Sequence, residues 1–516
     1  MAESWARSCG VSFCPNKCAA LFFNKGQFRP EKELQLYGEP IKWEDNTKYL
    51  GIFMDNNLDF QFHIENKIGA AKRKLMILKR VFEQTWGPRP KLIRWAYTGI
   101  VRPALTYGCV VWAKAIRTET MKSKLNSLQR LALVQIAGVR PSTPTAALEL
   151  IYNVPPLDIH IQELALKTAV RINIKPNWFP NNNKGHQHLL FESLSSIACL
   201  DDNNKTREWE MNYSVVIEDG KDITDRTGLS CYTDGSKIND RAGVGGIILK
   251  DDLEFCHFYY RLGDRSVYQA EICAIISATK ILLSNRFESQ VINIMVDNQA
   301  SLKALLNPES ASDLIRSAKS NLNLLGNNNV ITLRWIEGHK GWKYNEIADR
   351  LAKRGAEPYC NRKGIQPRPS IRSVYSEIES NSLKTWTSRW QSSPDCRQTK
   401  YFWVAPSKRE SQYILSESRE IISQLVRFLT GHAFLKRHNA VVFHGISPPP
   451  GDISCRLCED LYSEETPHHI ITECEALHFW RLENLGAHIL EEYPQWKSSD
   501  LIKYLGNKDI ILLETE

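Results

Sequence analysis

The stretch Leu229–Ser236, L-S-C-Y-T-D-G-S, decides the fold of the region around it. Its apolar and β-branched residues predict a strand, and Asp234 stands near the end of that strand among small and apolar neighbours. The segments Ala242–Lys250 and Glu254–Leu262 carry the same kind of strand pattern. Together the three segments predict an antiparallel meander.

Helical and strand patterns alternate after this meander. The sequence predicts a helix at 268–283, a strand at 290–297, a helix at 298–306, one more helix, a strand at 330–338 and a last helix around 345–354. Helices that cover a mixed sheet form an α/β layer architecture. We therefore expect a mixed five-stranded sheet with flanking helices, preceded by a mainly helical region and followed by a small helical segment.

Four acidic residues stand where these elements could converge, namely Asp234, Glu271, Asp297 and Asp349. Asp297 ends an apolar strand, where burying an unpaired charge is costly. Taken singly, each acid has an ordinary explanation as a turn residue, a solvated helix acid, a helix cap or a surface charge. Clustered carboxylates raise one another's pKa unless cations neutralise them, and their hard oxygen ligands suit Mg²⁺ or Mn²⁺.

The strings around these acids form a family pattern. Y-T-D-G-S, Q-A-E, V-D-N-Q-A and G-H-K-G-W-K-Y-N-E-I-A-D, in this order and spacing, resemble the ribonuclease H (RNase H) family over residues 226–358. The resemblance implies an RNase H-like fold and a metal-dependent endonuclease that hydrolyses the RNA strand of RNA–DNA hybrids. It also implies two Mg²⁺ or Mn²⁺ ions, with Asp234 bridging both, Glu271 and Asp297 completing one site, and Asp349 holding the other.

The same resemblance assigns roles to residues beside the acids. His339, in the G-H-K-G loop, matches the family histidine that assists proton transfer and product release, although an ordinary loop histidine is the alternative. Gly235 and Ser236 are small enough for the backbone to approach a ribose, and contact with 2′-hydroxyls would select the RNA strand.

Three strings near the N-terminus resemble the last palm segments and the thumb of a jockey-like non-LTR retrotransposon reverse transcriptase. They are C-G-V-S-F-C-P-N-K-C, K-Y-L-G-I-F-M-D and I-V-R-P-A-L-T-Y-G-C-V-V-W. Under this resemblance residues 1–60 end the palm and residues 61–172 form a helical thumb and connection. Lys17 matches the lysine that follows the polymerase catalytic strands, and Tyr49-Leu50-Gly51 matches the primer-grip turn.

A basic helix within 61–172 carries Lys72, Arg73 and Lys74. This run is either a solvated helix face or, given the resemblance, a contact to template and primer. The palm strands that bear the polymerase aspartates would lie upstream of Met1. We therefore expect no DNA synthesis by this chain unless an upstream reverse-transcriptase chain joins it.

The last third of the chain contains a Cys/His pattern. Residues 173–225 predict a linker and residues 359–450 a helical connector, and Cys455-x2-Cys458-x10-His469-x4-Cys474 follows within 451–516. These ligand types and spacings fit a Cys₃His Zn²⁺ site, with His468 as a competing ligand and unrelated cysteines as the alternative. The string E-E-T-P-H-H-I-I-T-E-C resembles the zinc-knuckle-like end of the same retrotransposon proteins.

Composition limits the remaining possibilities. The chain has 516 residues, a net charge of +8 and 13 cysteines, and it begins with no apolar signal segment. We expect an intracellular protein of the nucleus or cytoplasm, not secreted and not membrane-bound, whose partners are RNA–DNA hybrid and element RNA and DNA. The leading interpretation is a truncated retrotransposon Pol product with RNase H activity. The alternative is a catalytically silent nucleic-acid-binding remnant.

Overall fold

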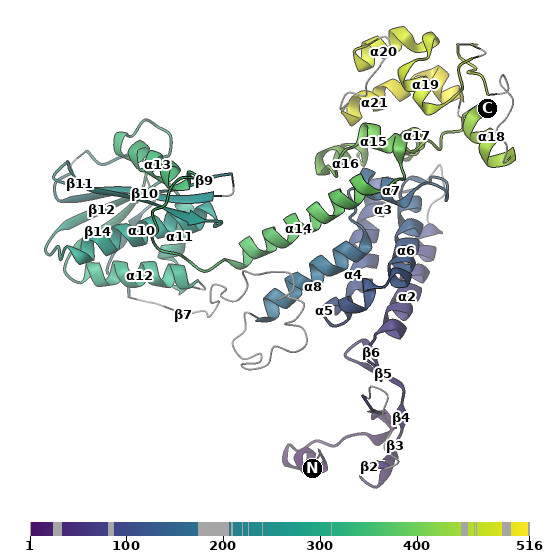
Figure 1. Cartoon of the computed structure of the whole chain (residues 1–516). Helices are drawn as coiled ribbons and strands as arrows, with labels where there is room; N and C mark the ends of the chain where they lie inside the picture. The colour runs from purple at the N-terminus through teal and green to yellow at the C-terminus, as the bar shows by residue number, and fades with distance from the viewer. Residues whose placement is uncertain are drawn as a thin grey trace. The chain divides into compact units, whose positions relative to one another are not determined.

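The chain divides into two compact units in a computed structural model (Figure 1). Residues 1–165 and 379–516 form unit 1, and residues 166–378 form unit 2. The structure describes residues 2–23, 33–80, 87–173, 206–207, 210–218, 220–224, 226–239, 241–310, 312–444, 453–458, 460, 462–487 and 497–513.

Unit 2 is built on a six-stranded mixed sheet with the strand order β11-β10-β9-β12-β14-β8. Its strands are β8 (Ser214–Val216), β9 (Leu229–Ile238), β10 (Arg241–Lys250), β11 (Leu253–Gly263), β12 (Val291–Val296) and β14 (Val330–Trp335). Strands β9, β10 and β11 form the expected antiparallel meander, whereas β12, β14 and β8 continue the sheet in parallel.

The sixth strand corrects our expectation of five. Strand β8 falls within the predicted linker at 173–225, yet it pairs with β14 through Leu333 and its neighbours. Just before it, the buried Tyr213 donates its hydroxyl proton to the Leu305 carbonyl oxygen at 2.9 Å. Three residues are too few to show an alternating pattern, so this edge strand could not be predicted from the local sequence. Residues 174–205, in the rest of the predicted linker, lie outside the described part of the chain.

Helices cover both faces of this sheet. The first face carries α10 (Val267–Ser284), α11 (Gln299–Leu306) and α12 (Asp313–Gly326), and the second carries α13 (Lys343–Ala356) (Figure 1). Helix α13 lies very close to β10 because Gly243 has no side chain. A Cβ atom there would lie 2.2 Å from the Ala352 carbonyl oxygen. This close packing fixes the position of α13, which carries Asp349.

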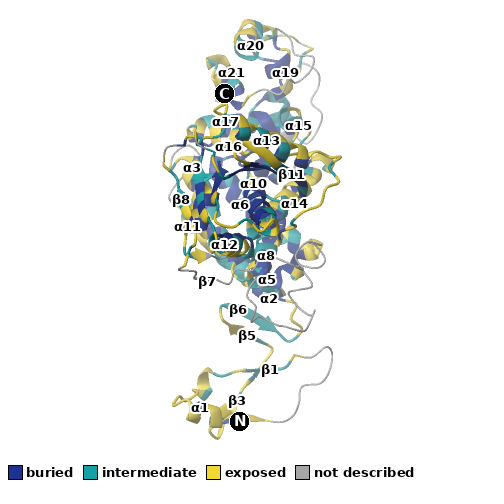
Figure 2. Ribbon diagram, turned by 90° about the vertical axis from the view of Figure 1, so that its left-hand side faces the viewer, coloured by how far each residue is buried: buried dark blue, intermediate teal, exposed yellow. Residues whose placement is uncertain are grey.

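Helix α10 is long and apolar enough, by length and composition, to cross a membrane. This differs from our expectation that no such segment exists. Most of its residues are buried within unit 2 (Figure 2), including Ala270, Cys273 and Ile275, which are fully buried in the core of the sheet's first face. The apolar character of α10 is therefore explained by its position as a core helix.

Unit 1 is mainly helical, and its two parts of the sequence share one hydrophobic core. The N-terminal part contributes α2 (Gln61–Lys79), α6 (Glu119–Ala137) and α7 (Thr145–Ile151), and the C-terminal part contributes α16 (Lys408–Ile414), α17 (Arg419–Thr430), α19 (Pro467–Thr472) and α21 (Ser498–Leu505). The buried Arg419 donates to the carbonyl oxygens of Gln135 and Ile136, both at 2.8 Å, where α6 ends. Such contacts satisfy carbonyl groups that a helix end leaves unpaired.

The structure therefore groups the chain differently from the predicted boundaries. The segments 359–450 and 451–516, which we expected to be separate, contribute to the same core as residues 61–165. The division between the units falls within α14 (Ile371–Ser392). Residues 1–60 contain several short strands, of which β5 (Asn46–Tyr49) and β6 (Ile52–Asp55) form a hairpin.

Candidate active site and metal centre

Three of the four predicted acids meet at one end of the sheet in unit 2. Carboxylate oxygens of Asp234, Glu271 and Asp297 all lie within 4.8 Å of one another. Strands β9 and β12 are parallel neighbours in which Thr233 is paired with Val296, so the next residue of each strand is an aspartate. This register places Asp234, in the middle of β9, beside Asp297, the residue that directly follows β12.

The third acid comes from helix α10, and Gly235 allows it to approach. A Cβ atom at Gly235 would lie 2.4 Å from the backbone nitrogen of Glu271, so any side chain there would push α10 away from β9. We had predicted that Gly235 makes room for a ribose. The structure shows that the missing side chain makes room for α10, and the ribose contacts of Gly235 and Ser236 stay predictions.

Burial and mutual repulsion make the three carboxylates strong proton or cation acceptors. Burial, followed by repulsion from Asp297 and Asp349, raises the pKa of Asp234 to about 7. Burial and the charges of Asp234 and Asp297 also raise the pKa of Glu271 well above its usual range, and burial raises that of Asp297. The buried Oε2 atom of Glu271 has no hydrogen-bond partner among the residues that the structure describes. An oxygen-only donor set with unsatisfied negative charge fits a divalent cation such as Mg²⁺ or Mn²⁺.

The fourth acid, Asp349, lies outside the group of three. Its Oδ2 atom is 2.6 Å from Nζ of Lys353, one turn further along α13. The charge of Asp349 still reaches the cluster, because it contributes to the raised pKa of Asp234. The Lys353 ammonium thus pairs with the carboxylate that the family resemblance assigns to a second ion.

We expect Lys353→Ala to lower the Mg²⁺ concentration needed for half-maximal binding about two-fold, because exposed i,i+4 ion pairs are weak. Calorimetric titration of the two proteins with Mg²⁺ measures this change. Arg350→Ala removes an exposed positive charge from the same helix and is the matched control. An equal change in the control would mean that general charge, and not the pairing with Asp349, is responsible.

Three further residues contact or influence Asp297. His339 lies exposed in the loop between β14 and α13 with a φ of 57°, and its charge lowers the pKa of Asp297. The buried Asn345 donates a side-chain hydrogen bond to the same carboxylate, and Nε1 of Trp335 donates to the Asp297 carbonyl oxygen at 3.0 Å. Sequence reasoning missed Asn345 and Trp335. Asn345 could have been predicted, because it stands four residues before Asp349 and therefore lies on the same helix face.

The Cys/His pattern of the C-terminal region also converges. Ligand atoms of Cys455, Cys458, His469 and Cys474 all lie within 4.8 Å of one another. The Sγ atoms of Cys455 and Cys474 are 3.9 Å apart, and Sγ of Cys458 is 3.4 Å from Nε2 of His469. A hydrogen bond with the Cys474 thiol lowers the pKa of Cys455 to about 3, which favours a thiolate in the cluster. Sulfur and imidazole donors in this number fit a structural Zn²⁺ site.

Local structure separates the two candidate histidines. His469 is 5% exposed on α19, with Nε2 in the cluster and a buried Nδ1. Its neighbour His468 has Nδ1 3.1 Å from the Thr472 hydroxyl and is not in the cluster. Cys455 and Cys474 are buried in the unit 1 core, so the cluster faces inward. Any metal held there would be shielded from solvent on that side.

The remaining predicted contacts lie on the surface of unit 1. Lys72, Arg73 and Lys74 are exposed on α2, which fits a solvated face and a nucleic-acid contact equally well. Lys17 ends a short 3₁₀ helix, and Tyr49 with Leu50 and Gly51 forms the turn of the β5–β6 hairpin. The predicted contacts of these residues with nucleic acid stay predictions.

With this geometry in view, comparison with known proteins identifies the domain. Residues 226–357 match the family model described as RNase H. These residues form an RNase H domain. The order of its strands and helices and the three converging acids agree with that family, whose members use divalent metal ions.

Curated relatives confirm the resemblance to the Pol proteins of R1 and jockey non-LTR retrotransposons. The chain is 27% identical over 169 residues to a putative 115 kDa protein in the type-1 retrotransposable element R1DM of Drosophila melanogaster. It is 31% identical over 182 residues to the RNA-directed DNA polymerase from mobile element jockey of the same species. These matches cover 33% and 34% of this chain but only 16% and 19% of the relatives' lengths.

Relatives of the RNase H domain alone were also found. A ribonuclease H from Rhizobium etli is 46% identical over 39 residues, which are 8% of this chain and 26% of that protein. A crystal structure of RNase H1 from Halobacterium salinarum is 22% identical, covers 25% of this chain and 96% of its own, and has a TM-score of 0.21. An N-terminal RNase H domain from Mycobacterium tuberculosis is 14% identical with a TM-score of 0.22, covering 25% of this chain and 98% of its own.

Proposed function

We propose that the RNase H domain cleaves the RNA strand of RNA–DNA hybrids with two Mg²⁺ or Mn²⁺ ions. The observation that carries the proposal is the group of three buried carboxylates, Asp234, Glu271 and Asp297, with an unsatisfied oxygen on Glu271. Ions bound there would activate the attacking water and stabilise the leaving 3′ oxygen. In this proposal Asp234, Glu271 and Asp297 would hold the ions, and Asp349, which pairs with Lys353, would be the fourth ligand.

Residues around the acids would support this reaction. Asn345 and Trp335 orient Asp297 through its carboxylate and its carbonyl group. His339 is exposed in a loop beside that carboxylate, so it can accept a proton and release it to solvent. Ser236 follows Asp234 on β9, and a contact from it to a ribose 2′-hydroxyl would select RNA over DNA.

A cleavage assay tests the proposal. Purified protein is given Mg²⁺ and a hybrid with a labelled RNA strand, beside Asp297→Asn and the same strand in an RNA duplex. We expect cleavage of the hybrid alone, with 5′-phosphate and 3′-hydroxyl ends, and a loss of at least about a hundred-fold in the variant. Equal cleavage by both proteins would contradict the proposal. Binding of the hybrid without cleavage by either would instead support a silent nucleic-acid-binding protein.

We further propose that Zn²⁺ occupies the Cys/His cluster. Four donors of three thiols and one imidazole are the ligands that structural zinc prefers, and the inward-facing position suits a role in holding unit 1 together. The proposed partners are element RNA and DNA and an upstream reverse-transcriptase chain, in the nucleus or cytoplasm. The matched retrotransposon relatives support this proposal, because one is described as an RNA-directed DNA polymerase.

A further inference from the structure

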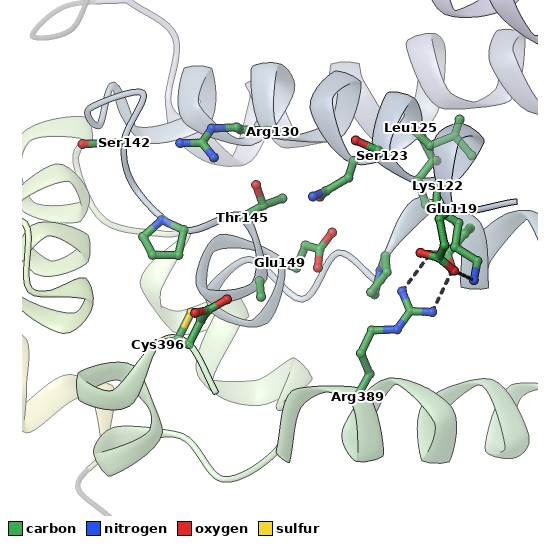
Figure 3. A pocket seen from close by; sticks show the side chains of 17 residues that line it. Glu119, Lys122, Ser123, Leu125, Arg130, Ser142, Thr145, Glu149, Arg389 and Cys396 are labelled. Carbon is green, nitrogen blue, oxygen red and sulfur yellow. Dashed lines mark hydrogen bonds and ion pairs between the residues drawn. The ribbon is translucent and has the colours of Figure 1, made fainter. Parts of the chain in front are cut away.

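Unit 1 contains a pocket of about 840 Å³ that plays no part in the proposed nuclease (Figure 3). It lies among α6, α7, the start of α8 (Leu157–Asn173) and the segment around residues 389–396, all within this unit. Its charged lining consists of Glu119, Lys122, Arg130, Glu149, Asp158, Arg389 and Asp395.

The central feature of the pocket is Glu149 on α7, which is only 6% exposed. Its Oε1 atom accepts a hydrogen bond from Nε2 of Gln129 at 2.6 Å, and the Gln129 Oε1 atom accepts one from the Tyr97 hydroxyl at 2.8 Å. This chain of bonds fixes the orientation of the carboxylate. Its other oxygen, Oε2, has no partner among the described residues, and the carboxylate lies at the pocket wall (Figure 3).

Two of the three cations that line the pocket are paired with acids. Lys122 donates to Glu119 at 2.6 Å, and Arg389 makes two bonds to Asp158 at 2.9 and 2.7 Å. The guanidinium of Arg130 donates to the Pro141 carbonyl oxygen, which is neutral and does not compensate its charge. The acids of the pocket, Glu119, Glu149, Asp158 and Asp395, therefore outnumber its cations, Lys122, Arg130 and Arg389.

Two carboxylates of the pocket make no ion pair among the described residues, although the charge of Arg389 lowers the pKa of one of them, Glu149. They are the buried Glu149 and the exposed Asp395 at the segment that follows α14. Burial, only partly offset by the bond from Gln129, raises the pKa of Glu149 to about 8. At pH 7 this carboxyl is therefore mostly protonated, and a positive ligand group beside it would favour its charged form, so the binding test is made at pH 9.

We propose that this pocket binds an organic cation, a guanidinium or primary ammonium group, through the free carboxylate oxygen of Glu149. A metal ion fits less well, because hard cations need several oxygen ligands and Glu149 is the one buried acid here with a free oxygen among the described residues. A planar guanidinium can also use neighbouring oxygens such as the Thr145 hydroxyl, which lines the same wall. The cation could be a free polyamine-like molecule or an arginine side chain of a basic peptide.

Calorimetric titration of the full chain tests the proposal with agmatine, spermidine and a short arginine-containing peptide as probes. Glu149→Gln keeps the shape of the side chain and the bond from Gln129 but removes the charge. We expect at least one probe to bind the wild-type protein and to bind this variant at least about ten-fold more weakly. Binding of agmatine or spermidine alone would indicate a small-molecule ligand, whereas binding of the peptide would indicate a protein partner.

Two further variants serve as controls for this test. Asp395→Asn should weaken binding by a smaller factor, because this carboxylate is exposed. Glu483→Gln changes an exposed acid outside the pocket and should bind as the wild type does. The proposal is overturned if no probe binds, if Glu149→Gln binds as tightly as the wild type, or if inorganic phosphate binds in place of the cations. Unchanged thermal unfolding of Glu149→Gln will show that a loss of binding is not a loss of fold.

Discussion

Replacing Asp234 with asparagine is expected to abolish hybrid cleavage and, at the same time, to stabilise the metal-free RNase H domain. Asp234 is 6% exposed and lies within 4.8 Å of Glu271 and Asp297, measured between carboxylate oxygens. The substitution removes a ligand from the proposed metal site, so activity should fall by at least about a hundred-fold. It also removes a buried charge from a repulsive group, which should raise the free energy of unfolding.

The shift in the pKa of Asp234 shows in which direction the free energy of unfolding changes with pH. The pKa of Asp234 rises from 3.8 to about 7 on folding, so between these values the folded protein holds a proton that the unfolded chain releases. The contribution of Asp234 to the stability of the wild-type metal-free domain is therefore fully present below pH 4 and is lost as the pH rises toward 7. This loss is on the order of 4 kcal/mol for the shift of Asp234. Asp234→Asn should lack this part of the pH dependence.

Urea denaturation in the presence of a chelator, at pH 5 and pH 8, measures both proteins. Adding Mg²⁺ should stabilise the wild type by ligand binding to the folded state and should have little effect on the variant. Glu288→Gln, which changes an exposed acid of the same unit, is the control and should behave as the wild type. A variant that is less stable than the wild type at pH 8 without metal would disprove the repulsion argument.

Removing metal from the Cys/His cluster is expected to destabilise all of unit 1, and not only the C-terminal segment. Cys455 and Cys474 belong to the same core as α6 and α17, and Arg419 connects α17 to the end of α6. Loss of a structural metal removes binding energy that contributes directly to folding. We expect Cys455→Ser combined with Cys458→Ser to lower the unfolding temperature of this unit by about 10 °C.

Metal analysis and hydrogen exchange check this prediction. The bound zinc should fall by about one ion per chain in the double variant. Amide protection should decrease in α6 as well as in the residues around α19. Cys9→Ser combined with Cys14→Ser removes two exposed cysteines outside the cluster and should change neither measurement. Unchanged zinc content in the cluster variant would exclude the zinc site, and protection lost only near α19 would exclude the wider role.

Local sequence patterns predicted much of the RNase H domain. The strand that carries Asp234, the helix that carries Glu271 and the order of the elements after them were expected and are present. Strand β8 was not expected, because its three residues are too short to show a period. The membership of residues 397–513 in the same unit as residues 61–165 was also not expected. That grouping depends on apolar faces far apart in the chain, and each of these faces looks like any other amphipathic helix.

The amino-acid sequence by itself determined which acids could form the site and which cysteines could bind a metal. Tertiary structure decided how they are used. The pairing of Thr233 with Val296 brings Asp234 and Asp297 together, and Lys353 pairs with Asp349, which lies outside their group. Folding also selected His469 over its neighbour in the Cys/His cluster and formed the pocket around Glu149. The physical reason is the separation along the chain. Periodicity and motif spacing reflect contacts between residues that are close in the sequence. Strand register, side-chain pairing and cavities arise from packing between segments that are far apart in the sequence.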